Sequence, residues 1–379
     1  MPTLLIVGAG FSAPAGFPVG DQLYPTITRL ADRTPPLAEE LAEDIDRFLR
    51  YSLDTTGEEP KRELLNLEEF MAFLDIEHSL ALLGSDTLTD AGNRSQMITR
   101  NLIAVALHEC LRATTPAQRA PYMALASQLH PGDLVISFNY DTLLESVFDQ
   151  LRLPYRLFPD RLASVSEWGG VLKIPEEEII LLKVHGSIDW FDRTDFDRTD
   201  AAWAKVGATD RPFHPVFTDP GRCQVEPLVS GPYFPESPLL TLTRARNLAP
   251  YLNQSSFALQ APFLVAPSAY KTLYLDPLKE FWNGFARVGA GFTRMAIIGF
   301  SLPAHDQYVR QPIYNLVRNY QSSDTTVLGN KKSDLLMVDL RNDEKAERCF
   351  RETYRFVDWA RSRVDFSGFS GRAVETLFS

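Results

Sequence analysis

The stretch from Leu4 to Pro18, LLIVGAGFSAPAGFP, decides the fold that the rest of the chain completes. Its four leading apolar residues predict a short strand buried on both faces, as in a parallel sheet. Gly8 and Gly10 then allow a tight turn with the backbone close to a ligand, because neither residue carries a Cβ. A helix that begins just after such a turn presents free N–H groups that favour phosphate. The stretch therefore predicts a dinucleotide site near the start of the chain.

The composition of the 379 residues is that of an ordinary globular protein, with 45% hydrophobic and 23% charged residues. A formal net charge of −11 argues against direct nucleic-acid binding, because phosphate surfaces need clustered Lys and Arg. No apolar run approaches the roughly 20 residues that cross a membrane, and the N-terminus lacks the basic flank of a signal peptide. We therefore expect a cytoplasmic protein without membrane contact.

The three cysteines, Cys110, Cys223 and Cys349, lie far apart in the chain. The absence of a C-x-x-C pair excludes a zinc ribbon, and the spacing disfavours a disulfide framework. The sequence therefore predicts no zinc and no other metal site.

Apolar spacing of three to four residues predicts helices over residues 21–30, 37–83 and 95–113, with a loop near residues 55–60. These helices separate the first strand from the next one. They therefore predict an inserted helical subdomain at about residues 31–130.

Residues 133–141, DLVISFNYD, predict a second buried strand, and a helix follows over residues 142–151. Open α/β sheets bind ligands at the carboxyl ends of their strands, which places Asn139 and Asp141 at a site. Asp141 fits equally well as a cap of the following helix, and both interpretations stay open for it. For Asn139 the site interpretation is favoured.

A third strand over residues 179–184 leads into His185-Gly186-Ser187. A lone histidine is more often structural than catalytic, but this one repeats the strand-end placement of Asn139. That placement favours a functional role for His185 over a structural one.

Residues 191–262 are irregular and rich in proline, which predicts a second insertion that serves as a lid or faces a partner. Within it, residues 192–200, DRTDFDRTD, indicate a charged, solvated loop.

Regular structure returns with strands at residues 263–268, 295–302 and 335–340 and with helices at 277–288, at 306–320 and from 344 into a tail. Strands that alternate with helices predict an α/β fold, a doubly wound, mostly parallel, Rossmann-like sheet in one domain over residues 1–379. Several of these strands end in Gly, Ser, Asn, His or Asp. That recurrence predicts a single site at one edge of the sheet.

Four motifs together resemble the sirtuin superfamily in order and approximate spacing: Gly8-Ala9-Gly10-Phe11-Ser12 with Gly16-Phe17-Pro18, Asn139-Tyr140-Asp141, His185-Gly186-Ser187 and Gly299-Phe300-Ser301. The chain is more similar to prokaryotic sirtuin-like proteins of antiviral defence. These carry Asn-Tyr-Asp and a Gly-aromatic-Ser-Leu-Pro…Asp stretch like residues 299–306. Pro267-Ser268 with Lys271, followed by Phe281-Trp282, also looks like that group.

Two departures separate the chain from deacetylase sirtuins. It lacks their four-cysteine zinc module, and it has Val19-Gly20-Asp21 where they have a Phe-Arg pair. Both argue against a cleft for acetyl-lysine peptides. The resemblance implies instead NAD+ hydrolysis, with NAD+ as substrate and NAD+ depletion during infection as the output.

The resemblance also implies residue roles. Asn139 can orient a water or a ribose hydroxyl, and His185 can take a proton, since histidine titrates near neutral pH. The NAD+-binding residues it implies are Gly8, Ala9, Gly10, Ser12, Gly16, Pro18, Asp141, Ser187, Gly299 and Ser301.

Three alternatives remain. An oxidoreductase of the Rossmann type expects an acidic residue after a second strand about twenty residues on, but residues 30–36 follow no strand. A regulatory module that binds NAD+ or ADP-ribose without turnover, and an NAD+-dependent deacylase, stay open.

A toxic hydrolase must also be held inactive. We therefore expect a homo-oligomer, or a separate sensor subunit such as a DNA-translocating ATPase or a short Argonaute. The chain carries no Walker-type motif of its own.

Overall fold

A computed structural model describes residues 2–58, 60–82, 92–207, 214–253, 261–265, 267–268, 276–282, 289–303 and 306–379. Its centre is a seven-stranded sheet in which all paired strands are parallel, in the order β12-β11-β10-β1-β2-β6-β3. The strands are β1 (Thr3–Val7), β2 (Leu134–Ser137), β3 (Tyr155–Arg156), β6 (Ile179–Lys183), β10 (Arg294–Ile298), β11 (Leu335–Val338) and β12 (Ser362–Asp365). The predicted parallel α/β class is confirmed.

β1 lies in the middle of this sheet and is buried along its whole length. Ile6 is flanked by Ile297 of β10 on one side and by Ile136 of β2 on the other. Burial on both faces explains the uninterrupted apolar run of this strand. The chain leaves β1 for β2 on one side and later adds β10 on the other. This reversal of strand order is where open α/β sheets bind ligands.

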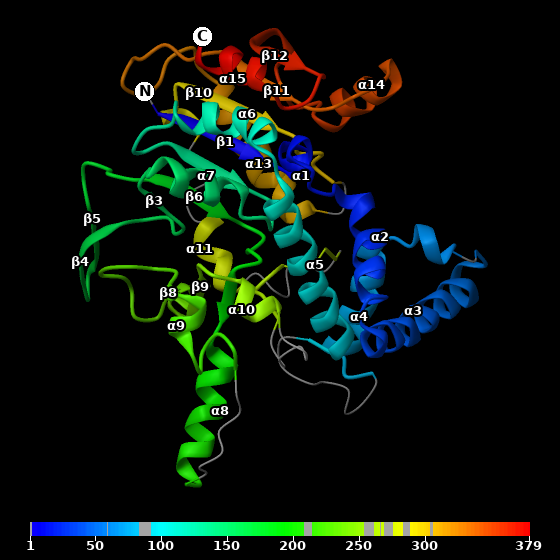
Figure 1. Cartoon of the computed structure of the whole chain (residues 1–379). Helices are drawn as coiled ribbons and strands as arrows, with labels where there is room; N and C mark the ends of the chain where they lie inside the picture. Colours follow the sequence, from blue (N-terminus) through cyan, green and yellow to red (C-terminus); the bar gives the residue numbers. More distant parts are fainter. Residues whose placement is uncertain are drawn as a thin grey trace.

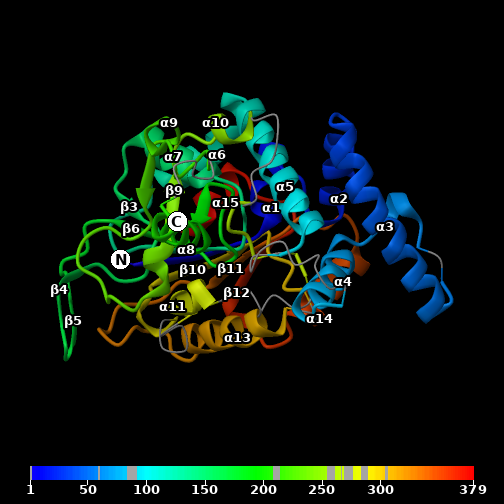
Figure 2. The ribbon, with the colours of Figure 1, turned by 90° about the horizontal axis from the view of Figure 1, so that it is seen from below.

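Helices cover both faces of the sheet (Figures 1 and 2). α6 (Pro116–Ala126), α7 (Leu143–Leu151) and α15 (Gly371–Phe378) lie on one face, and α13 (Gln307–Gln321) lies on the other. α6 was not predicted, because two prolines mask its apolar pattern. Thr115 and Gln118 nevertheless form a capping box at its start, and Pro116 lies in the first turn, where no N–H is needed.

A helical block lies beside the sheet (Figure 1). It contains α2 (Gly20–Ala31), α3 (Pro35–Thr56), α4 (Leu67–Ser79) and α5 (Arg94–Ala113). Gly57, in the left-handed conformation, ends α3 at the predicted loop. Phe48 of α3 packs edge-on against Phe70 of α4, with ring centroids 5.7 Å apart. Residue 83, at the end of the predicted helical range, lies outside the described residues.

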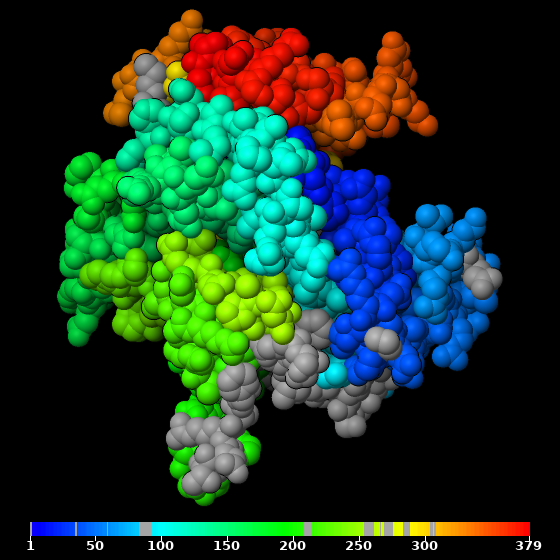
Figure 3. All heavy atoms as spheres, in the orientation of Figure 1, coloured from blue at the N-terminus to red at the C-terminus, as the bar shows by residue number. Residues whose placement is uncertain are grey.

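The second insertion has more regular structure than the sequence predicts. β7 (Trp190–Asp192), β9 (Leu242–Ala245) and β8 (Val225–Pro227) form an antiparallel sheet, with the short helices α9 (Pro220–Cys223) and α10 (Ala249–Leu252) beside it. Residues 192–200 are not a loop: Asp192 ends β7, and residues 194–200 form the first part of α8 (Thr194–Lys205), which projects from the body (Figure 3). Ion pairs one helical turn apart, Arg193–Asp197 at 2.9 Å and Arg198–Asp195 at 2.7 Å, support the helix.

Two further segments differ from the prediction, and a third is described only in part. β4 (Leu162–Ser166) and β5 (Gly169–Leu172) form an unpredicted hairpin. After α14 (Glu344–Thr353), the predicted tail instead forms β12 and α15. Of the helix predicted at 277–288, the structure describes α11 (Lys279–Trp282), and residues 283–288 and Lys271 lie outside the described residues.

In the described part of the chain, no helix is both long and apolar enough to cross a membrane.

Candidate active site

A cavity of about 1190 Å³ lies at the carboxyl ends of the parallel strands. Loops after six strands contribute to its walls: residues 8–10 after β1, 138–141 after β2, His185 after β6, 299–301 after β10, 339–341 after β11 and 367–368 after β12. Its volume is slightly above the range of about 300–1,000 Å³ that is usual for small-molecule sites. The cavity is therefore large enough for an extended dinucleotide.

The glycine turn after β1 (with the short helix α1, Ala9–Ser12) packs directly against the loop after β10. The Gly10 N–H donates to the Gly299 carbonyl at 2.9 Å, and the Gly8 N–H donates to the Ile298 carbonyl at 3.1 Å. Gly299 has a φ of +61°, and a Cβ there would lie 2.1 Å from the Phe11 nitrogen. The glycines therefore allow two backbone segments to approach each other, a reason the sequence alone did not reveal.

Asn139 joins the loops after β2 and β1. Its side chain is 8% exposed, and its Nδ2 donates to the Gly8 carbonyl at 2.9 Å and to Ser12 Oγ at 3.1 Å. Asn139, Gly8 and Ser12 all line the cavity. The Asn139 motif and the glycine turn are thus in direct contact.

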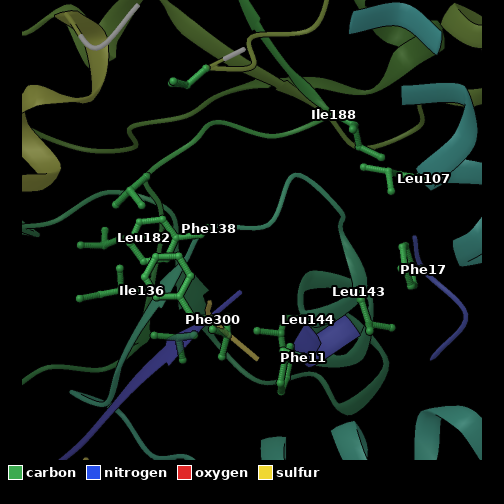
Figure 4. Close-up of a cluster of buried hydrophobic side chains, with 14 of the residues drawn as sticks. Phe11, Phe17, Leu107, Ile136, Phe138, Leu143, Leu144, Leu182, Ile188 and Phe300 are labelled. Carbon is green, nitrogen blue, oxygen red and sulfur yellow. The ribbon is translucent and has the colours of Figure 1, made fainter. Parts of the chain in front are cut away.

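His185 lies in an aromatic part of the same cavity and is 5% exposed. Its Nε2 lies 2.5 Å from the hydroxyl of Tyr308, at the start of α13, and its ring meets Phe138 edge-on at 5.1 Å. Phe138 in turn stacks on Phe300, with ring centroids 4.1 Å apart (Figure 4). The imidazole is therefore held between fixed aromatic groups.

Burial, reinforced by the carboxylates of Asp306 and Glu68, raises the pKa of Tyr308 and of Tyr140 far above the usual value for tyrosine. Both phenols therefore remain protonated. The Tyr140 hydroxyl donates to the Val265 carbonyl at 2.6 Å, and the Tyr308 hydroxyl is a neutral hydrogen-bonding partner for His185.

Asp141 fits both interpretations that the sequence left open. Its Oδ1 accepts a hydrogen bond from the Leu143 N–H at 3.0 Å at the start of α7, as a cap does. The same residue lines the cavity. Capping and ligand contact are therefore compatible at this position.

Two residues predicted to contact the ligand, Gly16 and Ser187, do not line the cavity. Gly16 (φ +90°) ends the turn of residues 13–15 behind the cavity wall. Ser187 is fully buried beneath the wall, where its Oγ accepts from Lys183 Nζ at 2.6 Å. The chain turns back under the sheet edge after His185, so Ser187 points away from the cavity. The other predicted residues that line it are Gly8, Ala9, Gly10, Ser12, Pro18, Asp141, Gly299 and Ser301.

Sequence reasoning missed several wall residues. Asp339 follows β11 directly and pairs with Arg341 at 2.7 Å, and both line the cavity. For Asp339 the signal was the one used elsewhere, a polar residue directly after an apolar strand. Residues 63–68 of the helical block also line the cavity, and no local signal indicated this because the contact arises from tertiary packing.

The cavity wall is acidic. Among the described residues that line it, the carboxylates are Asp21, Glu63, Glu68, Asp141, Asp306 and Asp339. Arg341 is the permanent cation of this described set. Such a wall favours a ligand that carries positive charge on one of its groups.

Within the described residues, no group of three or more His, Cys, Asp or Glu side chains is arranged to hold a metal ion. Cys110, Cys223 and Cys349 are free thiols.

No family model matches the chain, and no curated protein matches it. Solved structures that it resembles include a Sir2 mutant with a p53 peptide and NAD, at 11% identity and a TM-score of 0.32, covering 100% of this chain and 92% of that one. Sir2Tm bound to a propionylated peptide matches at 10% identity and a TM-score of 0.32, again covering 100% and 92%. With TM-scores this low, the fold class rests on the sheet order itself.

Proposed function

We propose that the chain is an NAD+ hydrolase that splits NAD+ into nicotinamide and ADP-ribose. The observation that carries the proposal is the convergence of Asn139 and His185 with the glycine turn on one large, acidic cavity. An amide and an imidazole at neighbouring strand ends supply hydrogen bonding and proton transfer, and the cavity volume accommodates a dinucleotide.

The acidic wall suits the chemistry of this substrate. The nicotinamide ring of NAD+ is cationic, and cleavage of its bond to ribose passes through a transition state with oxocarbenium character. Asp306 and Glu68 act electrostatically on Tyr308, the partner of His185, so negative charge lies near the imidazole. Carboxylates fixed in advance near developing positive charge lower the barrier.

The proposed step is a hydrolysis. The bond between C1′ of the ribose and the ring nitrogen breaks, and its electron pair neutralises the departing nicotinamide. A water oxygen bonds to C1′, and His185 accepts the proton that this water loses. Asn139, clamped to Gly8 and Ser12, orients the water or a ribose hydroxyl.

The test is to incubate the purified chain with NAD+ and to quantify nicotinamide and ADP-ribose, with and without an acylated peptide. A hydrolase releases both products in equal amounts without the peptide. Release that depends on the peptide would identify a deacylase instead. NAD+ binding without release under either condition would identify a regulatory module.

We further propose a role in antiviral defence by NAD+ depletion in the cytoplasm, which the motif resemblance supports. In this role, self-association or a separate sensor subunit, of the translocating-ATPase or short-Argonaute kind, restrains the activity. The test is NAD+ cleavage with and without the product of the neighbouring gene. Cleavage that is equal under both conditions and independent of protein concentration would contradict this restraint.

A further inference from the structure

We propose that Lys183 is a positioning residue that holds the 139–141 loop in its catalytic shape. This inference deepens the proposed function and rests on it. Lys183 ends β6 directly before the His185 loop, and it does not line the cavity. It therefore acts through the loop and not on the substrate.

The side chain of Lys183 is 1% exposed, and its ammonium group lies underneath the loop. Its Nζ donates to the Asp141 carbonyl at 2.5 Å, to Ser187 Oγ at 2.6 Å and to Glu145 Oε1 at 2.8 Å. Nζ also lies 3.4 Å from the Tyr140 carbonyl, so four acceptors share the three N–H donors of the ammonium group. The side chain is thus fully engaged with the backbone of the loop and with the elements on either side.

The loop is held from two opposite sides. From below, the Tyr140 carbonyl accepts from Ser187 Oγ at 3.3 Å and from Lys183 Nζ itself at 3.4 Å. From above, the Asn139 amide is clamped to Gly8 and Ser12 of the glycine turn. The orientation of the Asn139 amide therefore depends on Lys183 beneath as well as on the glycine turn.

Stability does not explain a charge at this position. Glu145, the ionic partner of Lys183, is 2% exposed, so the whole pair is buried. Desolvation makes buried ion pairs no more stabilising than apolar side chains of similar volume. An apolar residue at position 183 would continue the apolar pattern of β6, but it would give the loop carbonyls no donor. Positioning of the loop explains the lysine.

Arg156 of β3 is a matched control in the same chain. It is also 1% exposed, pairs with Glu176, and donates to the Phe158 carbonyl at 3.1 Å and the Pro159 carbonyl at 2.7 Å. None of these residues lines the cavity. Arg156 therefore performs the same structural task for a loop that carries no catalytic group.

The main test is the double variant Lys183→Met/Glu145→Gln, which removes both charges of the pair together. We expect kcat for nicotinamide release to fall about 100-fold with a small change in KM, because a misplacement near 1 Å costs about that much. Arg156→Met should keep the wild-type kcat. Wild-type kcat in the folded double variant, or an equal loss in Arg156→Met, would overturn the proposal.

Ser187→Ala is the milder variant, and it decides the question if the double variant does not fold. It removes one link between Lys183 and the Tyr140 carbonyl, and we expect kcat to fall several-fold with KM unchanged. An unchanged kcat in folded Ser187→Ala would contradict the proposal.

Hydrogen exchange of a peptide that covers residues 138–142 needs no turnover. Faster exchange in this peptide, with the rest of β2 and β6 unchanged, is expected for either variant. If the wild-type chain releases no nicotinamide, the proposed function fails, whereas unchanged exchange in the variants overturns the role of Lys183.

Discussion

The carboxyl edge of the parallel sheet and the projecting helix α8 are both rich in polar side chains. The two regions differ in how far these side chains are buried. At the sheet edge, Asn139 and His185 are buried and each has a specific partner. On α8, the Arg193–Asp197 pair is 43% and 53% exposed and contacts solvent. Burial with defined partners makes a polar group hard to replace, whereas exposure makes it replaceable. Substitutions at the sheet edge should therefore have larger effects than substitutions on α8.

Loss of the imidazole at the sheet edge should be the most damaging change. We predict that His185→Ala lowers kcat for nicotinamide release by about 10³-fold, within the range for loss of a general base. Product quantification with NAD+ at saturation measures this. A variant that retains more than about a tenth of wild-type kcat would remove His185 from the mechanism.

The close approach of the two loops at the sheet edge predicts a large effect on folding. Gly299→Ala places a Cβ 2.1 Å from the Phe11 nitrogen at a φ of +61°, so we expect the free energy of unfolding to fall by at least about 3 kcal/mol. Gly371→Ala, where a Cβ meets nothing within 4 Å, is the control and should stay near the wild-type value. Denaturant titration of both variants gives the comparison, and equal stabilities would refute the packing argument.

His214, in the second insertion, is a buried titratable group whose effect on stability depends on pH. Burial lowers the pKa of His214 to about 4, so the folded chain keeps this ring neutral where the unfolded chain binds a proton. Stability present above about pH 6.5 is therefore lost as the pH falls toward 4, by about 3 kcal/mol for this group.

The measurement is denaturant unfolding of wild type and His214→Asn between these pH values. The asparagine can accept the hydrogen bonds that the Val216 and Phe217 N–H groups now donate to Nδ1, both at 3.2 Å. We expect a shallower pH dependence in the variant. Parallel curves for the two proteins would show that His214 does not contribute.

The exposed pair on α8 should matter least. Asp197→Asn removes the partner of Arg193, and we expect the free energy of unfolding to change by less than about 0.5 kcal/mol. Thermal unfolding at low salt is sensitive enough to test this. A loss as large as that of Gly299→Ala would erase the contrast between the two regions.

The same contrast explains what the sequence could predict. Continuous apolar runs such as residues 4–7 identify buried parallel strands, because burial on both faces leaves no other pattern. Polar residues directly after such runs, as at Asn139 and His185, were correctly assigned to one edge. Ser187 was predicted at the same edge but is buried beneath it. The chain turns after His185, so a side chain two residues later lies in the interior and not in the cavity.

Other features depend on contacts between distant segments. The contribution of residues 63–68 to the cavity wall arises only when the helical block packs against the sheet. The charged repeat of residues 192–200 forms part of α8, where its ion pairs lie three and four residues apart. The sequence of this repeat is equally compatible with a loop, because it has no apolar period. β12 is a short edge strand of mixed polarity, which gives no periodic signal.

The central claim is that the sheet edge breaks NAD+ and does not merely bind it. Its most direct test is nicotinamide release from NAD+ by the wild-type chain and by Asn139→Ala, measured side by side on folded protein. We predict stoichiometric nicotinamide and ADP-ribose from the wild type and a loss of at least about 100-fold in the variant. Equal release by both proteins would contradict it.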